Sequence, residues 1–294
     1  MVGGKRKLTA ARIAFKLESG AFAVDSVKTR SSQLREVLMR TIVGGLLAIS
    51  VAFVARHTRI LSPSGAVMSG VVGTLAIAAG WTWGLLLVSF FVTANGLTRL
   101  GQRKKAQLVG PVIQPDGERD ARQVLANGGI YALAALGSLV FPSPIWYAAG
   151  AGALAASTAD TWATEVGILA GGEPVSIISA RKVAPGTSGG VTLIGTLAGA
   201  GGALFIAAGA TLANWPVPFA AVALGGMGGA LADSILGGLV QARRWCDLCA
   251  KSTERLVHSC GTPTRQVGGI AGFDNDVVNA VCSGFGALVA LLLL

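Results

Sequence analysis

The stretch QVLANGGIYALAALGSLVFPSPIWYAAGAGALAASTADTWATEVG (Gln123–Gly167) contains thirty-seven consecutive uncharged residues before its first acid, Asp160. A helix needs about 20 apolar residues to cross a bilayer. The run is therefore long enough for two membrane-spanning helices. The prolines and aromatic residues of FPSPIWY, in the middle of the run, predict the turn between them.

The spacing of charges along the rest of the chain predicts further spans. Uncharged runs occupy residues 41–55, 60–98, 183–232 and 277–294. Each long run fits two helices and each short run fits one. The composition agrees, because 52% of the residues are hydrophobic and 13% are charged, against about 25% charged in soluble domains. We expect an all-α fold, a polytopic membrane bundle of about eight glycine-rich transmembrane helices.

Two sets of connections alternate along this bundle. The turns AGWTW, FPSPIWY and NWPVPF carry Trp and no charge, so they predict one aromatic belt at the membrane surface. The opposite loops, 97–122, 170–189 and 241–276, contain more Lys and Arg than acids. The positive-inside rule therefore makes these loops cytoplasmic. We read the net charge of +10 as this bias and expect no nucleic-acid partner.

The first forty residues form a separate segment before the single transmembrane domain, 41–294. They carry nine Lys or Arg and three acids, yet one span at Arg40–His57 places them on the outer side. Three interpretations stay open. Met39 is the true start, or the basic tail contains an interfacial or re-entrant helix, or the first span is not a full crossing.

Glycine-rich stretches favour close helix packing in lipid. Two of them resemble each other, SPSGAVMSGVVGTLAIAAG (Ser62–Gly80) and APGTSGGVTLIGTLAGAGG (Ala184–Gly202). The similarity has two interpretations, an internal repeat of related halves or the shared composition of glycine-rich helices.

Acids and amides recur near the cytoplasmic ends of the predicted helices. They are Asn95, Asp160, Glu165, Asp233, Asp274, Asn275 and Asn279. An ionisable residue in a membrane segment costs free energy and marks a functional candidate, although paired residues that stabilise a bundle are the simpler explanation for any single one. Oxygen ligands with few histidines indicate Mg²⁺, or Na⁺ or H⁺.

The loops supply opposite charge. We expect phosphate-binding groups at Arg99, Arg103, Lys105, Arg119, Gln123, Asn127, Arg181, Lys182, Thr187, Gly189 and Gly190. The last three belong to a small-residue turn that opens a predicted helix, and free N–H groups at a helix start favour an anion. Solvated positive-inside charge is the alternative for each single Lys or Arg.

Four residues of the last loop have metal-ligand spacing. Cys246 and Cys249 form CxxC, and His258 and Cys260 follow as HxC. This pattern predicts one structural Zn²⁺. A disulfide is less favoured in a cytoplasmic loop, and Cys282 reads as a packing residue in the last span.

The motifs STADTWATEVG, PGTSGGVT, LADSILGGLVQ and DNDVVN resemble those of the transmembrane protein 19 / phytyl-phosphate kinase family, over about residues 41–294. Plant members of that family are prenyl-phosphate kinases that make phytyl diphosphate, and many members have no assigned activity. The CxxC…HxC loop departs from the eukaryotic members.

The resemblance implies an enzyme that moves a phosphoryl group from CTP or ATP to a prenyl monophosphate at the membrane. The implied catalytic positions are Asp160, Thr161, Glu165, Asp233, Asn275 and Asn279, with Asp160, Glu165, Asp233 and Asp274 as Mg²⁺ ligands. A transporter or ion channel that uses intramembrane carboxylates is the alternative, and a non-catalytic lipid-binding or scaffold protein is the third. The sequence leaves a homo-oligomer open.

Overall fold

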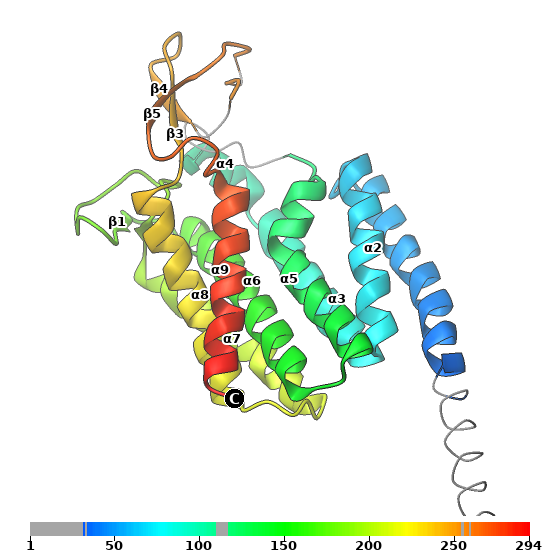
Figure 1. Ribbon diagram of the computed structural model, residues 1–294. Coiled ribbons are helices and arrows are strands. Elements are labelled where there is room, and N and C mark those ends of the chain that lie inside the picture. Colours follow the sequence, from blue (N-terminus) through cyan, green and yellow to red (C-terminus); the bar gives the residue numbers. More distant parts are fainter. Residues whose placement is uncertain (1–31, 33, 110–116, 254–255, 259) are drawn as a thin grey trace, which may run out of the picture.

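The computed structural model describes residues 32, 34–109, 117–253, 256–258 and 260–294. Eight helices stand together in one bundle (Figure 1). They are a first helix (Leu34–His57), α2 (Pro63–Ala79), α3 (Trp81–Arg99), α5 (Ala121–Val140), α6 (Pro144–Ala170), α7 (Leu193–Leu212), α8 (Phe219–Leu239) and α9 (Asn275–Leu292). The expected all-α bundle of about eight glycine-rich helices is confirmed.

Six of these helices are long and apolar enough to cross a membrane, namely the first helix, α3, α5, α7, α8 and α9. The other two differ for separate reasons. Helix α2 is apolar but shorter, with 17 residues. Helix α6 has 27 residues and lies inside the bundle, in contact with α5, α7, α8 and α9. Its neighbours shield it from lipid, so it does not need a lipid-facing apolar surface.

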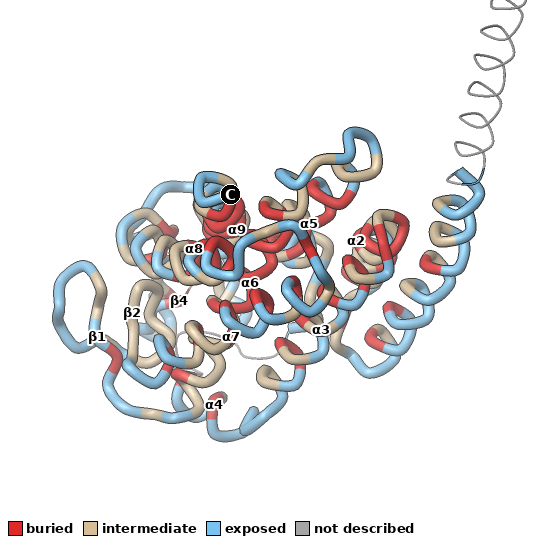
Figure 2. The backbone as a smooth tube through the Cα atoms, turned by 90° about the horizontal axis from the view of Figure 1, so that it is seen from below, coloured by how far each residue is buried: buried red, intermediate tan, exposed pale blue. Residues whose placement is uncertain are grey.

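Small residues allow α6 to occupy the centre of the bundle. Residues 150–159 are Gly, Ala, Ser or Thr apart from Leu154, and all of them are buried (Figure 2). A Cβ atom at Gly152 would collide with the Gly286 carbonyl oxygen of α9, and one at Gly286 would lie 2.7 Å from the Gly152 carbonyl oxygen. The backbones of α6 and α9 therefore touch, which is the close packing that small residues permit in membranes.

The three Trp-bearing turns meet at one end of the bundle, but the predicted aromatic belt is wrong in part. Trp83 and Trp215 are buried rather than directed at the headgroups. Trp83 packs against Tyr131, Tyr147 and Trp215 at ring-centroid distances of 5.1, 5.3 and 4.4 Å. The Tyr131 hydroxyl donates to the Trp83 carbonyl, so burial leaves this polar group satisfied. The aromatic rings close the bundle, and Trp81 stays exposed.

The other end carries the polar connections, and we call it the loop face (Figure 1). It holds α4 (Gln102–Val109), the antiparallel pair β1 (Val175–Ser176) and β2 (Gly190–Val191), and a sheet of β3 (Arg243–Cys246), β4 (Lys251–Thr253) and β5 (Arg265–Gly268) in the order β4-β3-β5. All three charged loops lie at this end, as the charge pattern predicts. Its cytoplasmic orientation stays a prediction of the positive-inside rule.

The first helix begins at the end opposite the loop face (Figure 1). Its 24 residues reach a crossing length, which argues against an incomplete first span. Arg40 lies 4.0 Å from Glu36 and donates to the Ala79 carbonyl at the same end. The interfacial helix expected within residues 1–40 falls almost entirely outside the described residues.

The two similar glycine-rich stretches form different structures at their starts. Ser62 caps α2, which is helical from Pro63, whereas residues 184–192 of the second stretch form a turn and strand β2 before α7. Each stretch leads into an outward helix followed by a returning helix. The resemblance does not extend to the helix boundaries.

The hairpin arrangement predicts the reactivity of cysteines placed in the three Trp-bearing turns. Trp81→Cys, Phe141→Cys and Pro216→Cys are at exposed positions and should all react with a membrane-impermeant maleimide added to intact cells. The exposed Arg181→Cys on the loop face should react only after permeabilisation. Labelling of only one or two of the three turns would contradict this topology.

Candidate functional site

A cavity of about 160 Å³ opens beside α6, between α7, α8 and the loop that precedes α7. Asp160 of α6 and Asp233 of α8 both line it, and we call it the acidic pocket. Asp233 lies six residues before α8 ends at Leu239, which is about 9 Å along the helix at 1.5 Å per residue. Asp233 therefore lies in the loop-side third of α8, and the pocket connects both acids with the loop residues.

Asp160 and Asp233 are close enough for their charges to repel each other. Both side chains are half-buried, and the Cys282 thiol of α9 is within hydrogen-bonding reach of Asp233. Two carboxylates in one partly buried site disfavour joint ionisation unless a cation lies with them. This pair is therefore a candidate cation site made of hard oxygen ligands.

The glycine turn that the sequence indicates for phosphate forms one wall of this pocket. Thr187, Gly189 and Gly190 line it. Gly189 has a φ of 79°, which L-residues with a side chain rarely adopt, and an added Cβ would lie 2.7 Å from the Gly238 Cα of α8. Only glycine lets this turn pack against the end of α8, close to Asp233.

Helix α7 starts directly after this turn and faces the same pocket. Thr192 caps it by accepting a hydrogen bond from the Gly195 N–H at 3.0 Å, and both residues line the pocket with Thr196. The positive end of a helix dipole attracts negative charge. The pocket therefore places a carboxylate pair opposite an anion-favouring helix start, which suits a cation bound together with an anion.

Several pocket residues escaped the sequence analysis. Gln241 is buried at 3% exposure, and no described residue accepts a hydrogen bond from its Nε2. Ser234 and Thr192 also line the pocket. The sequence offered only weak signals for these two residues. Ser234 directly follows Asp233, and Thr192 is a helix-capping residue type just before a glycine-rich helix. The packing of the end of α8 against the turn at Gly189 brings these residues to the site.

Helix α9 contributes less than the sequence predicts. Asn275 lines the acidic pocket. Asp274 instead caps α9, accepting from the Val277 N–H, and pairs with Arg122 at 2.8 Å. Asn279 is half-buried one turn further along and does not line the pocket. Asp274 is thus already occupied as a cap and ion-pair partner.

Glu165 is not brought together with Asp160. Five residues on an α-helix turn the side chain by about 140°, so the two acids leave α6 on different faces. Glu165 accepts hydrogen bonds from Lys105 and from the Thr98 hydroxyl, each at 2.6 Å. Thr161, on the same side of α6, donates to the Ser157 carbonyl. Neither Glu165 nor Thr161 lines the acidic pocket.

The surroundings of Glu165 form a compensated network. Lys105 is buried and donates to the Leu97 carbonyl at 2.5 Å as well as to Glu165. Arg119 donates to Thr98 at 3.2 Å. Burial lowers the pKa of the Arg119 guanidinium, and the nearby charge of Glu165 acts against that shift. Lys105 therefore holds the end of α3, and it does not reach the acidic pocket.

A second, apolar cavity of about 300 Å³ lies between the first helix, α2, α3 and α5. Its polar residues include three of the expected phosphate ligands, Arg119, Gln123 and Asn127. Gln123 belongs to the capping box of α5 with Asp120, and Asn127 donates to the Gln123 carbonyl. These three residues lie apart from the acidic pocket, in a different part of the bundle.

The remaining predicted cations are on the surface of the loop face. Arg99, Arg103, Arg181 and Lys182 are exposed, and none of them lines the acidic pocket. Arg99 donates to the Thr58 carbonyl at 2.6 Å, and Lys182 pairs with Glu173. They contribute positive charge to the loop face without forming a defined anion site.

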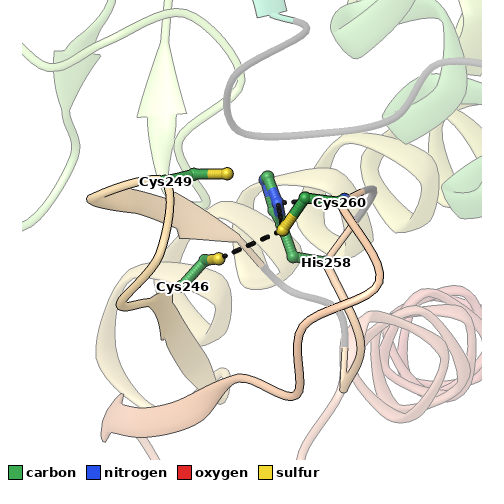
Figure 3. A group of neighbouring side chains, drawn as sticks. All are labelled: Cys246, Cys249, His258 and Cys260. Atoms are coloured by element: carbon green, nitrogen blue, oxygen red, sulfur yellow. Dashed lines mark hydrogen bonds between the residues drawn. The ribbon is translucent and has the colours of Figure 1, made fainter.

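The fold brings all four residues of the predicted cysteine and histidine motif together. The ligand atoms of Cys246, Cys249, His258 and Cys260 all lie within 4.8 Å of one another (Figure 3). Hydrogen bonds with Thr262 and His258 lower the pKa of the Cys260 thiol to about 6. A hydrogen bond with Cys260 is the main cause that raises the pKa of the Cys249 thiol to about 11, and burial is the second cause.

Comparison with known proteins identifies relatives. Protein PGR of Arabidopsis thaliana is 30% identical over 271 residues, which cover 82% of this chain and 92% of that protein. An uncharacterized membrane protein of Methanocaldococcus jannaschii is 32% identical over 212 residues, 71% of this chain and 86% of its own length. Protein VTE6, chloroplastic, of Arabidopsis thaliana is 27% identical over 243 residues, 79% and 65% of the respective chains. No solved structure matches.

The family model described as integral membrane protein DUF92 matches residues 46–287, a range that contains Asp160, Asp233, the glycine turn and the cysteine cluster. The chain therefore belongs to the DUF92 family of integral membrane proteins.

Proposed function

We propose that this protein is an integral membrane kinase that transfers a phosphoryl group from CTP or ATP to a prenyl monophosphate and yields the diphosphate. The observation that carries the proposal is the acidic pocket, in which Asp160 and Asp233 face a glycine turn and the start of α7. The motif resemblance to the phytyl-phosphate kinase family and the similarity to Protein VTE6 support the reaction.

The donor set of the pocket fits Mg²⁺. Asp160 and Asp233 would hold the ion, with Asn275 as a neutral oxygen donor nearby. Bound Mg²⁺ would supply charge neutralisation for the phosphates of the nucleotide. Glu165 is paired with Lys105, and Asp274 is paired with Arg122, so we leave both out of the proposed ligand set.

The chain's own groups would bind and orient the phosphates. The Gly189 N–H of the turn and the positive end of the α7 dipole suit phosphate oxygens. The Gly190 N–H is left out because it donates to the Thr187 carbonyl at 2.9 Å. Gln241 offers a buried amide donor. Phosphoryl transfer depends on positioning and electrostatic stabilisation more than on covalent catalysis by side chains. A pocket without a strong general base therefore suffices.

The pocket also offers access for a lipid. Leu231 of α8 and Thr196 of α7 line it and are exposed on the outside of the bundle. Leu108, Ile168 and Met227 add apolar lining. An isoprenoid chain in the bilayer could therefore lie against α7 and α8 while its phosphate enters the polar part of the pocket.

The proposed reaction has a simple balance. An oxygen of the lipid phosphate attacks the γ-phosphorus of the nucleotide and forms the new P–O bond of the diphosphate. The bond from the γ-phosphorus to the β–γ bridging oxygen breaks, and the nucleoside diphosphate leaves with that electron pair. The attacking phosphate oxygen is already anionic at neutral pH, so no side chain has to remove a proton from it.

An ion transporter is the second candidate, and one observation favours it. Asp160 and Asp233 lie together between membrane helices, an arrangement that also suits a bound Na⁺ or a shared proton. The two candidates differ in their assay, since a transporter moves ions across vesicles without forming a diphosphate.

The first prediction concerns the acid pair. Asp160→Asn and Asp233→Asn should each lower diphosphate formation by about 100-fold or more, because removing one charge-stabilising group from an active site has effects of about that size. The assay contains purified protein, a prenyl monophosphate, Mg²⁺ and CTP or ATP. Asp120→Asn is the matched control, since Asn also caps a helix well and residue 120 is exposed outside the pocket.

The kinase proposal fails if no nucleotide supports diphosphate formation by the native protein. If Asp160→Asn then changes ion flux in reconstituted vesicles, the transporter is the better account.

A second prediction separates Glu165 from the acid pair. Glu165→Gln should keep the turnover rate within about 3-fold of the native value but lower the free energy of unfolding by about 3 kcal/mol or more, because it leaves Lys105 buried without its counter-charge. The double variant Lys105→Met/Glu165→Gln should be more stable than Glu165→Gln alone. A loss of turnover equal to that of Asp160→Asn, with unchanged stability, would contradict this prediction and indicate that Glu165 is a metal ligand.

A third prediction tests the glycine turn. Gly189→Ala should raise the KM for the nucleotide, because the strained φ and the contact with Gly238 push the turn away from α8. Gly96→Ala is the control, since an added Cβ there meets no atom within 4 Å. Equal nucleotide KM values for the two variants would show that the turn does not bind the nucleotide.

A further inference from the structure

The segment Gln241–Phe273 projects from the loop face between α8 and α9, and we call it the finger (Figure 1). It contains the sheet β4-β3-β5, and the part of it that the structure describes has no hydrophobic core. Among its described residues, those that are buried are Gln241, Cys246, Thr253 and Thr264. Its large apolar side chains are exposed, including Leu248 at 72% and Leu256 at 70%. A fold this small needs another source of stability, such as a metal or a disulfide.

Two turns of the finger direct the four cysteine and histidine side chains toward one point (Figure 3). Cys246 ends β3, and the turn to β4, with Ala250 at a φ of 51°, brings Cys249 back over it. In the facing turn, His258 N–H donates to the Thr262 carbonyl and Gly261 N–H donates to the His258 carbonyl. The turns come from separate parts of the chain, so their convergence is a property of the fold.

The four ligand atoms are gathered within 4.8 Å of one another, and the Cys246–Cys260 separation is that of a tetrahedral zinc site. At Zn–S and Zn–N lengths of about 2.3 and 2.0 Å, tetrahedral ligand atoms lie about 3.5–3.8 Å apart. The Cys246 and Cys260 sulfurs are 3.7 Å apart, within this range. His258 Nδ1 lies 3.2 Å from the Cys260 sulfur, slightly closer than the range, so a bound ion would move the two ligand atoms apart by a few tenths of an ångström. All four cysteines of the chain are free thiols, so no disulfide supplies the missing stability.

We propose that Cys246, Cys249, His258 and Cys260 bind one Zn²⁺ that holds the finger folded. The ligand set is the Cys₃His type of a closed structural site. The ion stabilises the finger in place of the core that the segment lacks. This inference concerns the finger alone and does not depend on the kinase proposal.

The base of the finger connects the zinc site with the acidic pocket. The Ala242 N–H donates to the Phe273 carbonyl at 2.8 Å, and the Ile270 N–H donates to the Val240 carbonyl at 2.9 Å. These bonds join the segment after α8, which contains Gln241, to the segment before α9, which leads to Asn275. Both Gln241 and Asn275 line the pocket. A folded finger therefore fixes the spacing between the ends of α8 and α9.

The experiment measures metal in the full-length protein, purified in detergent without chelators. Elemental analysis should give about one zinc per chain. The double variant Cys246→Ser/Cys249→Ser should lose most of it, and so should Cys260→Ser. Cys282→Ser is the matched control, because this buried cysteine of α9 belongs to no ligand set and its variant should keep the zinc.

Two further readouts test coordination and folding. Protein loaded with Co²⁺ should show the intense visible bands of a tetrahedral thiolate site, and His258→Ala should change them. Limited proteolysis should cut the zinc-depleted protein within the finger while the helices stay intact, because the bundle has its own core.

Three results would overturn the inference. They are full zinc content in the Cys246→Ser/Cys249→Ser variant, native protein without zinc that does not take up added Zn²⁺, and cysteines that react with a thiol reagent only after reduction. The last result would make the cluster a disulfide. None of them bears on diphosphate formation, so failure here is distinct from failure of the proposed kinase.

Discussion

Direct contact between the backbones of α6 and α9 sets the packing of the whole bundle. Gly152 and Gly286 bring the two helices together, and the buried small residues 150–159 let α5, α7 and α8 pack around α6 as well. Glycine and alanine pack closely but cannot fill space far from the axis. Larger side chains and polar groups must then lie toward the ends of the bundle, where the aromatic cluster and the loop face are found.

The two acids of α6, Asp160 and Glu165, have opposite electrostatic surroundings. Glu165 points toward α3 and α4, where Lys105 and Thr98 compensate it. Asp160 points toward α7 and α8, where its nearest charge is a second acid, Asp233. A compensated acid stabilises the fold, whereas an acid beside a like charge is costly unless a ligand joins it. This difference is the reason that we propose a structural role for Glu165 and a functional role for Asp160.

The finger and the glycine turn meet the bundle at the same place. The turn packs on the end of α8 through Gly189, and the finger joins the ends of α8 and α9 through its base. Both therefore shape the acidic pocket from the loop side, and the exposed cations around them give the loop face its positive charge. The polar loops therefore position the ends of α8 and α9 around the pocket, which contacts between the apolar helices alone do not define.

Sequence patterns alone predicted the helix number, the turns at FPSPIWY and NWPVPF, the common side of the charged loops and the grouping of three cysteines with His258, because charge spacing and ligand spacing are local properties. Which polar residues meet is visible only in the folded bundle. The fold placed Asp233 beside Asp160, paired Glu165 with Lys105 and Asp274 with Arg122, buried Trp83, and added Gln241 to the pocket. The physical reason is that glycine-rich helices are apolar on every side, so their sequence does not reveal which face meets which neighbour. That choice depends on backbone contacts between residues far apart in the chain.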